Sequence, residues 1–275
     1  MTRQFGRVVE VHIGPPGELG RKITGLRTAF DASKDEDAAT DRCAITLWNP
    51  SPDTIRLLET QGTYTRLLAG YGTPVQVAAG DTVVDSLRVE KTGPDRVVTW
   101  SIRDGGLQLD STFISQAWAT GVSADTVLRT LAASAGLAVG VIVASAATYS
   151  YPDGYVAYGS LRSPLIDIAS DLGAVWVIQD NALSVYPRGG DKRTPMAVIS
   201  AQSGMIGSPV ARANKRLEVT ALLLPSMRPG QPFRVTSNVA TGDLIATDVQ
   251  HRGDSGYDVD FYTTIVGRPR SANGT

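Results

Sequence analysis

The chain has 275 residues, of which 42% are apolar, and its 26 basic and 27 acidic residues give a formal net charge of −1. The apolar fraction excludes a disordered protein. The length is enough for two domains, or for one domain with an insertion. The nearly neutral charge balance argues against tight nucleic-acid binding, because such proteins neutralise phosphates with a basic stripe. A nearly neutral chain is still compatible with lining a passage through which DNA slides.

Residues 1–105 are predicted to form a first β-unit. Short runs of strand-forming residues alternate with Gly, Pro and Asp turns, which is typical of a barrel or sandwich. One short helix interrupts them, with Ser51 as its cap and Pro52 in its first turn. The predicted strands cover residues 7–13, 23–30, 43–48, 75–79, 82–90 and 96–102, with a turn at Gly80-Asp81 between two of them.

Residues 106–190 are predicted to form an α/β insert. Ser123–Gly136 has a serine cap, apolar residues at helical spacing and a terminal glycine, and a strand at 137–143 follows. The pattern returns 37 residues later, where Ser163 as cap and Pro164 open a second helix before a strand at 174–178. This predicts a duplicated helix–strand unit, whose second copy continues into a hairpin that turns at Asp180-Asn181.

Residues 191–275 are predicted to form a second β-unit. Its strands cover residues 217–224, 233–237, 244–251 and 258–266, separated by Gly- and Pro-containing turns such as Thr241-Gly242-Asp243, and the tail from 268 to 275 is expected to fray. The predicted fold class is therefore mostly β with an α/β insert. Two β-barrel or sandwich units, 1–105 and 191–275, flank a smaller helix–strand domain, 106–190.

Few groups are available for covalent or metal chemistry. Cys43 is the single cysteine, so neither an intrachain disulfide nor a multi-cysteine zinc site can form. The N-terminus lacks the apolar core of a secretory signal, and Leu131–Ala147 is too short and too weakly apolar to span a bilayer. We expect a soluble protein made in the cytosol, without membrane insertion.

The two histidines do not indicate an active site. A zinc hydrolase needs several converging ligands, and a Ser-His-Asp triad needs a positioned base beside a nucleophile. His12 lies in a predicted strand among polar residues and is expected to face solvent. His251 is expected to be a polar strand-end residue or an interface contact.

Acidic and aromatic residues are the remaining candidates. Asp35-Glu36-Asp37 is expected to be a solvated loop tip, and the tripeptide Arg252-Gly253-Asp254 is interpreted as a chance match to an integrin-binding motif. Asp258 and Asp260 share a strand face near Asp248 and Asp254, so a calcium site or a glycosidase acid pair is the alternative there, although the run lacks calcium-loop spacing. We expect core packing, not a carbohydrate platform, for four tryptophans: Trp48, Trp100, Trp118 and Trp176. The sequence predicts no catalytic, cofactor-binding or metal-binding residue, and no enzyme.

Five short motifs, spread between residues 5 and 267, carry a resemblance. They are Ile45–Thr54 (with Pro50 at a usually apolar position), Leu67–Gly72, Ala169–Leu183, Ala221–Gly230 and Val249–Asp254. Together they resemble the central baseplate hub proteins of long-tailed, contractile bacteriophages and of phage-like injection machines.

This resemblance implies that both β-units have a tail-tube-like fold. Three copies would form a pseudo-sixfold ring that adapts the sixfold tail tube to the threefold spike and surrounds the DNA channel. Its implied partners are the chain itself as a homotrimer, the tail tube protein, the central spike protein, other baseplate proteins and a tape measure protein, with DNA only passing through. No cofactor is implied, His251 has no catalytic role, and the expected location is the virion tail baseplate, after assembly in the host cytoplasm. The alternatives are another tail ring or tube-initiator protein and a cell-wall glycosidase.

Overall fold

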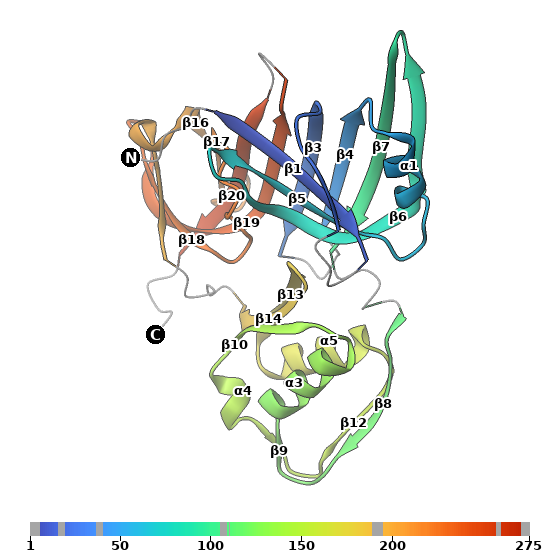
Figure 1. The fold of residues 1–275 in the computed structure, drawn as a ribbon. Helices are drawn as coiled ribbons and strands as arrows, with labels where there is room; N and C mark the ends of the chain where they lie inside the picture. Colours follow the sequence, from blue (N-terminus) through green and yellow to red (C-terminus); the bar gives the residue numbers. More distant parts are fainter. Residues whose placement is uncertain are drawn as a thin grey trace.

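The computed structural model describes residues 6–15, 20–36, 41–104, 109, 111–188, 195–256 and 260–270. Along the chain lie a first β-unit (β1 to β7), an insert (β8 to β14) and a second β-unit (β15 to β20), and the insert lies below both units in Figure 1. Each of the three parts encloses a cluster of buried apolar side chains, and the cluster of the first unit also includes Leu223 and Phe261 of the second unit. The predicted fold class, mostly β with a helix-containing middle part, is confirmed.

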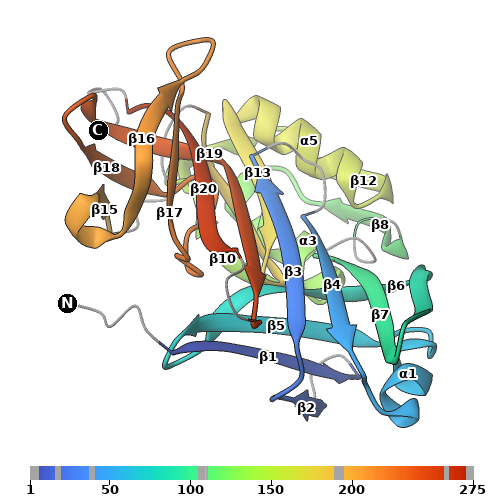
Figure 2. The same cartoon turned by 90° about the horizontal axis from the view of Figure 1, so that it is seen from above.

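The first β-unit is one bent antiparallel sheet with the strand order β3-β4-β7-β6-β5-β1-β2. The strands β1 and β5 run across β3 and β4, so the sheet folds over itself into two layers (Figure 2). Its elements are β1 (Arg7–Gly14), β2 (Arg21–Ile23), β3 (Thr28–Asp35), β4 (Arg42–Trp48), α1 (Pro52–Leu58), β5 (Tyr64–Tyr71), β6 (Val75–Thr92) and β7 (Asp95–Arg103). The short helix α1 is confirmed with its predicted cap, Ser51.

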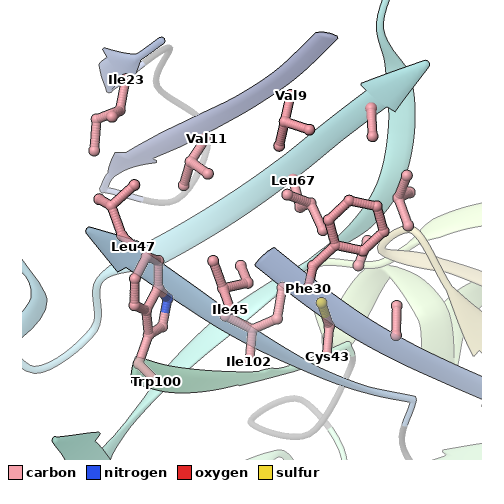
Figure 3. Packing of buried hydrophobic residues seen from close by; sticks show 14 of the residues in the cluster. Val9, Val11, Ile23, Phe30, Cys43, Ile45, Leu47, Leu67, Trp100 and Ile102 are labelled. Carbon is pink, nitrogen blue, oxygen red and sulfur yellow. The ribbon is translucent and has the colours of Figure 1, made fainter. Parts of the chain in front are cut away.

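The core between these layers follows from the alternation seen in the sequence. In β1, Val9, Val11 and Ile13 are buried, while the residues between them are partly exposed. Figure 3 shows Val11 and Leu67 from one layer facing Ile45 and other apolar side chains of the opposite layer. Each fully buried side chain of this kind contributes about 1.5–3 kcal/mol to folding, so this core is a main source of stability.

The strand β6 is continuous where the sequence predicted two strands. The turn predicted at Gly80-Asp81 is wrong, because both residues lie inside β6 and pair with β5. Gly80 serves a different purpose here, since a Cβ at this position would collide with the backbone carbonyl of Arg103. A glycine inside a strand commonly marks such a close approach of two backbones.

The insert packs two helices between two small sheets. α3 and α5 lie between the three-stranded sheet β10-β14-β13 and the ribbon of β8 and β12 (Figure 1). The elements are β8 (Phe113–Trp118), β9 (Val122–Ser123), α3 (Ala124–Ser134), β10 (Ala138–Ile142), α4 (Ser145–Thr148), β11 (Ser150–Tyr151), β12 (Tyr155–Ser160), α5 (Arg162–Asp171), β13 (Ala174–Gln179) and β14 (Ala182–Pro187).

The predicted helix–strand repeat is present as α3–β10 and α5–β13. Ser123 caps α3 as predicted, accepting a hydrogen bond from the backbone N–H of Thr126 at 3.2 Å. The cap predicted at Ser163 is wrong, because α5 already begins at Arg162 and Leu161 before it makes no side-chain cap. The two strands flank β14, with β10 parallel and β13 antiparallel to it.

The second β-unit repeats the strand order of the first. The order β16-β17-β20-β19-β18-β15 matches β3-β4-β7-β6-β5-β1, and equivalent strands follow the same sequence along the chain. The units differ in that β15 is parallel to β18, whereas β1 is antiparallel to β5. The elements are β15 (Ala197–Ser200), the short 3₁₀ helix η1 (Ala201–Ser203), β16 (Met205–Ala211), β17 (Leu217–Leu222), β18 (Pro232–Thr236), β19 (Thr241–Asp254) and β20 (Phe261–Pro269).

Two boundaries of the second unit differ from the prediction. The turn expected at Thr241-Gly242-Asp243 is wrong, because these residues open β19 and pair with β18. The same strand continues three residues beyond His251, to Asp254. β15 and β16 were not predicted; β16 is interrupted by a bulge between Ile206 and Val210, which hides its alternation.

The two β-units are joined edge to edge. Seven residue pairs, from Asp248 opposite Asp35 to Asp254 opposite Ala29, link β19 to β3 and make one sheet of 13 strands. We call this pairing the β3–β19 joint. Phe30 of β3 meets Phe261 of β20 edge-on at 6.2 Å, and Gly253 leaves the room that the Phe30 ring occupies.

Gly253→Ala is expected to loosen the joint. The added Cβ would collide with the Phe30 ring, and overpacking of this kind costs about 1–3 kcal/mol. Gly242→Ala is the matched control on the same strand, because nothing lies within 4 Å of its Cβ. The free energy of unfolding from urea titrations should fall for the first variant and change by less than about 0.5 kcal/mol for the second. Equal losses would contradict this role of Gly253.

Candidate functional site

Five charged side chains meet where the first β-unit, the insert and the second β-unit come together. Lys34 lies in β3, Asp41 before β4 and Asp104 after β7, while Asp180 lies in the β13–β14 turn and Arg228 between β17 and β18. Four of the five residues are less than 9% exposed, and Asp180 is partly buried. We call this cluster the charged junction.

The hairpin of the insert enters the junction through its turn. Asp180 and Asn181 both have positive φ angles, 54° and 62°, as a two-residue type I′ turn requires, and the turn predicted at these residues is confirmed. This conformation directs both backbone N–H groups at Asp104. The N–H of Asn181 donates to Oδ1 at 3.1 Å, and that of Asp180 donates to Oδ2.

Arg228 connects all three parts. Its Nε donates to Oδ2 of Asp180 at 3.0 Å, and its Nη2 donates to the backbone carbonyl of Gln76 in β6 at 2.9 Å. Its Nη1 donates to the carbonyls of Pro225 and Met227 in its own loop. One planar guanidinium therefore fixes the loop, the insert hairpin and the first β-unit relative to one another.

Lys34 supplies the second positive charge. It is 1% exposed, and its Nζ lies 3.3 Å from Oδ2 of Asp41 and 3.9 Å from Oδ1 of Asp180. Burial raises the pKa of Asp41, and it raises the pKa of Asp104 to about 7. Burial also opposes ionisation of Asp180, but the charges of Arg228 and Lys34 outweigh it and hold the pKa of this carboxyl below its usual value.

The junction has the features of a structural contact. The cavity beside Lys34, Asp41 and Asp104 measures about 10 Å³, which is barely the volume of one water molecule. No substrate fits there, and the polar atoms described above mostly bond to one another. Its chemistry is to hold the insert against the two joined β-units.

His251 lies next to the junction and is fully buried. Its Nε2 lies 3.2 Å from the carbonyl of Met227, and its Nδ1 lies 2.9 Å from the hydroxyl of Thr263, so a neutral ring satisfies both partners. Burial, followed by the charges of Arg228 and Lys34, lowers its pKa well below the usual value. The prediction of a strand-end or interface residue is therefore wrong, because the strand continues and covers this side chain.

His12 and the first acidic run also differ from their predictions. The side chain of His12 is 18% exposed and lies 3.3 Å from Oε2 of Glu10, so it faces solvent less than expected. Glu36 is not a solvated tip, since Arg268 lies 2.6 Å from it in an ion pair between the two β-units. Asp35 is partly buried in β3, and Asp37 lies outside the described residues.

The carboxylates considered for calcium binding or glycoside hydrolysis are partly described. Asp248 lies 3.5 Å from Arg216, and Asp254 forms a 2.9 Å ion pair with Arg27. Asp260 is exposed, whereas Asp258 lies outside the described residues, so the Asp258–Asp260 pair stays an alternative from the sequence. Within the described ranges, no three His, Cys, Asp or Glu side chains are grouped as metal ligands would be.

The Arg252-Gly253-Asp254 tripeptide belongs to the β3–β19 joint. Arg252 bonds to Asp31 across the joint at 2.9 Å, and Asp254 is paired with Arg27. A shallow hollow of about 500 Å³ lies over these residues on the outer face of the sheet. The tripeptide therefore stabilises the pairing of the two units.

Three of the four tryptophans match the prediction of core packing, because the half-buried Trp118 packs against the apolar core of the insert. Trp100 and Trp176 are buried, whereas Trp48 and Trp118 are half-buried. Trp48 lies beneath the guanidinium of Arg27 at 4.3 Å, which places it beside the joint.

No direct sign of the charged junction is visible in the sequence. Its members are separated by up to 194 positions, from 34 to 228, and no motif links them. One predicted feature belongs to it, the turn at Asp180-Asn181. A second signal was missed, because Lys34 continues the alternation of β3 beyond residue 30, where the predicted strand ends.

The sequence matches no family model and no curated protein. The fold is shared with solved structures at low sequence identity. A tail protein from Neisseria meningitidis aligns with a TM-score of 0.68, 14% identity and 96% coverage of both chains. The 43 kDa tail protein of prophage MuSo2 from Shewanella oneidensis aligns with a TM-score of 0.67 and 9% identity, and the alignment covers 96% of this chain and 99% of that protein. The E. coli c3393 protein, a type VI secretion component, aligns with a TM-score of 0.62 and 10% identity, and the alignment covers 94% of this chain and 77% of that protein.

These likenesses define the fold of the chain as that of phage tail proteins and of a type VI secretion component. In the part of the chain that the structure covers, no helix is long and apolar enough to cross a membrane.

Arg228→Met is expected to destabilise the protein by about 3 kcal/mol, because it leaves Asp180 partly buried without its main partner. Arg234→Met is the matched control, since it breaks an ion pair with Asp243 on the surface of the same unit and should cost less than about 1 kcal/mol. Chemical denaturation measures both. Similar losses would show that the junction contributes no more than an exposed pair.

The pH dependence of stability separates two buried groups. The pKa of Asp104 is raised from 3.8 to about 7, so its stabilising contribution is complete below 3.8 and is lost as the pH rises through about 7. The pKa of His251 is lowered from 6.5, so its contribution is complete above 6.5 and is lost as the pH falls. Between pH 5 and 7 the two effects oppose each other.

The contribution of each group to the pH dependence can be measured in a variant that lacks the other group. In His251→Gln the free energy of unfolding should rise as the pH falls from 7 to 5, by up to about 1.4 kcal/mol per pH unit. In Asp104→Asn it should fall over the same range. Urea titrations at pH 5, 6 and 7 measure these slopes, and slopes of the same sign in both variants would contradict the assignment.

Proposed function

We propose that the chain is a structural hub of a phage-type tail baseplate, with no enzymatic role. In this proposal three copies form a ring in which the two β-units of each copy occupy six similar positions. One face of the ring meets a sixfold tail tube, and the other meets a threefold spike. The corresponding division of the chain is 1–105, 106–190 and 191–275.

The observation that carries the proposal is the repetition of one strand order in two units that are paired edge to edge. A chain that already joins two similar units through β3 and β19 supplies one third of a six-unit ring. Closed rings follow when a head-to-tail contact repeats with a closing rotation.

Likeness to proteins from such machines supports the same function. The aligned structures include tail proteins, and the E. coli protein is described as structurally similar to the T4 bacteriophage tail proteins gp27 and gp5. By this analogy the partners are the tail tube, the spike, other baseplate proteins and a tape measure protein. The place of action is the virion tail, after assembly in the host cytoplasm.

The outer face of the joined sheet suits a channel wall. Thr46 and Thr99 share a hydroxyl hydrogen bond at 3.0 Å there, and Asp31 is paired with Arg252. Small hydroxyl groups and charges that are neutralised within the wall give passing DNA little to bind. A nearly neutral chain is better suited to lining a channel for DNA than to binding nucleic acid tightly.

The purified protein is expected to be a trimer at micromolar concentration, alone or with its spike protein. Native mass spectrometry measures the number of chains, and co-purification with the tube and spike proteins tests the partners. A monomer under both conditions would sink the proposal. A hexamer would indicate a ring of six copies, as in another tail ring or tube-initiator protein.

A further inference from the structure

The equivalence of the two β-units identifies strand edges that have no neighbouring strand among the described residues. In the second unit, the first part of β19 pairs with β18, and its last part, Asp248–Asp254, pairs with β3. The equivalent strand β6 pairs with β5 through its first part, 75–81. Its last part, 88–92, has β7 on one side and no strand of the described residues on the other.

At the other end of the sheet, too, no strand of the described residues occupies the partner position. β16 is the equivalent of β3, which lies between β4 and β19. β16 pairs with β17 on one side and, in the portion of the chain that is described, with no strand on the other. The free edge of β6 in one copy and the free edge of β16 in another thus correspond to the two sides of the β3–β19 joint.

We infer that β6 of one copy pairs antiparallel with β16 of the next copy and so repeats the β3–β19 joint between chains. This inference rests on the proposed trimer and names the surfaces that build it. The ring then contains three joints within chains and three between chains. The occupant of the free β6 edge is a second copy of this chain, because the internal joint already shows how an equivalent strand binds there.

Exposed apolar side chains lie on these two edges. Val89 on β6 is 47% exposed, and Ile206 and Val210 on β16 are 45% and 51% exposed. The whole of β16, Met205–Ala211, contains no charged residue. An uncharged, unpaired edge invites pairing with another chain unless a partner covers it.

One feature of β16 limits the ladder. Pro209 has no N–H to donate, and the register of β16 shifts between Ile206 and Val210. Proline is tolerated on edge strands and at bulges, so pairing on either side of it is possible. We expect the interchain ladder to lack a bond at this residue.

The register follows from the strand neighbours. In the internal joint, buried His251 lies opposite buried Ala32. We infer that Val89 takes the place of His251, with Val98 opposite it on β7 in the place of Thr263, which lies opposite His251 on β20.

On the other side of the joint, we infer that Ala211 of β16 takes the place of Ala32 of β3. Ala211 lies opposite Leu217 on β17, and Ala32 lies opposite Cys43 on the equivalent strand β4. Val89 is then opposite Ala211 and directed at the core. The next pair, Glu90 opposite Val210, occupies the outward position that Arg252 and Asp31 hold in the internal joint.

Disulfide trapping tests this pairing in the full chain. Directly opposed strand residues have Cβ atoms about 4.5–5.5 Å apart, close enough for a bridge after small adjustments. The double variant Glu90→Cys/Val210→Cys, mildly oxidised, should give covalent dimers and trimers on a non-reducing gel. The native Cys43 is buried and present in every variant, so it does not distinguish them.

Three controls make the result specific. Each single-cysteine variant alone should stay uncrosslinked, whereas an equimolar mixture of the two, assembled together, should give covalent dimers and no trimers. The pair Val75→Cys/Val239→Cys, at exposed valines elsewhere, should not crosslink. Val89→Asp should raise the concentration at which the trimer half-dissociates at least about tenfold, because it buries a charge in the joint.

The possible failures are distinguishable. A trimer by native mass that gives no crosslink at Glu90/Val210, nor at the neighbouring pair Lys91/Val210, would overturn the strand assignment and leave the hub proposal standing. A protein that stays monomeric with its spike would overturn the proposed function, and the inference with it.

Discussion

The antiparallel pairing of β3 with β19 is the contact on which the rest of the structure depends. It links residues more than 200 positions apart and turns two sheets into one. Because both strands belong to one chain, the contact forms without the loss of translational freedom that association between separate subunits entails. Arg27, Arg252 and the room left by Gly253 fix its register, and a slip of one residue would turn every side chain to the wrong face.

The charged junction adds orientation to that contact. Burying Lys34, Asp41 and Asp104 is costly, and an apolar cluster of the same volume could be as stable. Apolar packing, however, does not require a particular orientation of the packed groups, whereas hydrogen bonds do. The hydrogen bonds from the guanidinium of Arg228 and from the two N–H groups to Asp104 can form in only one position of the insert hairpin. We interpret the junction as the element that sets the angle of the insert to the sheet, which the proposed hub would need more than it needs additional stability.

Local signals in the sequence were sufficient for two capped helices and one tight turn. Ser51, Ser123 and the Asp180-Asn181 turn each specify a conformation through their own chemistry, and the structure has α1, α3 and the hairpin at those places. Glycine was the main source of error. At Gly80 the residue permits a close approach of two backbones, and this need arises from a strand that is distant in sequence.

Contacts between distant segments left almost no local trace. The sequence predicts that His251 is a polar strand-end residue or an interface contact, whereas the pairing with β3 extends the strand and buries the ring. The charges of the junction have ordinary neighbours in sequence, and only the fold brings them together. Their detection required the pairing of β3 with β19 and the docking of the insert, neither of which is a local property.

The differences between the two β-units are as informative as their likeness. The shared strands, β3, β4, β7 and β6 with their equivalents, form the joined wall, in which β16 has a bulge that β3 lacks. Other departures lie outside the wall: β15 is parallel where β1 is antiparallel, and the connection that carries α1 in the first unit carries Arg228 in the second. In the proposed ring, the wall would therefore repeat six times, while the outer layer and the insert would repeat three times. A single chain with one conserved layer and one diverged layer is a physical means of meeting a sixfold partner on one surface and a threefold partner on another.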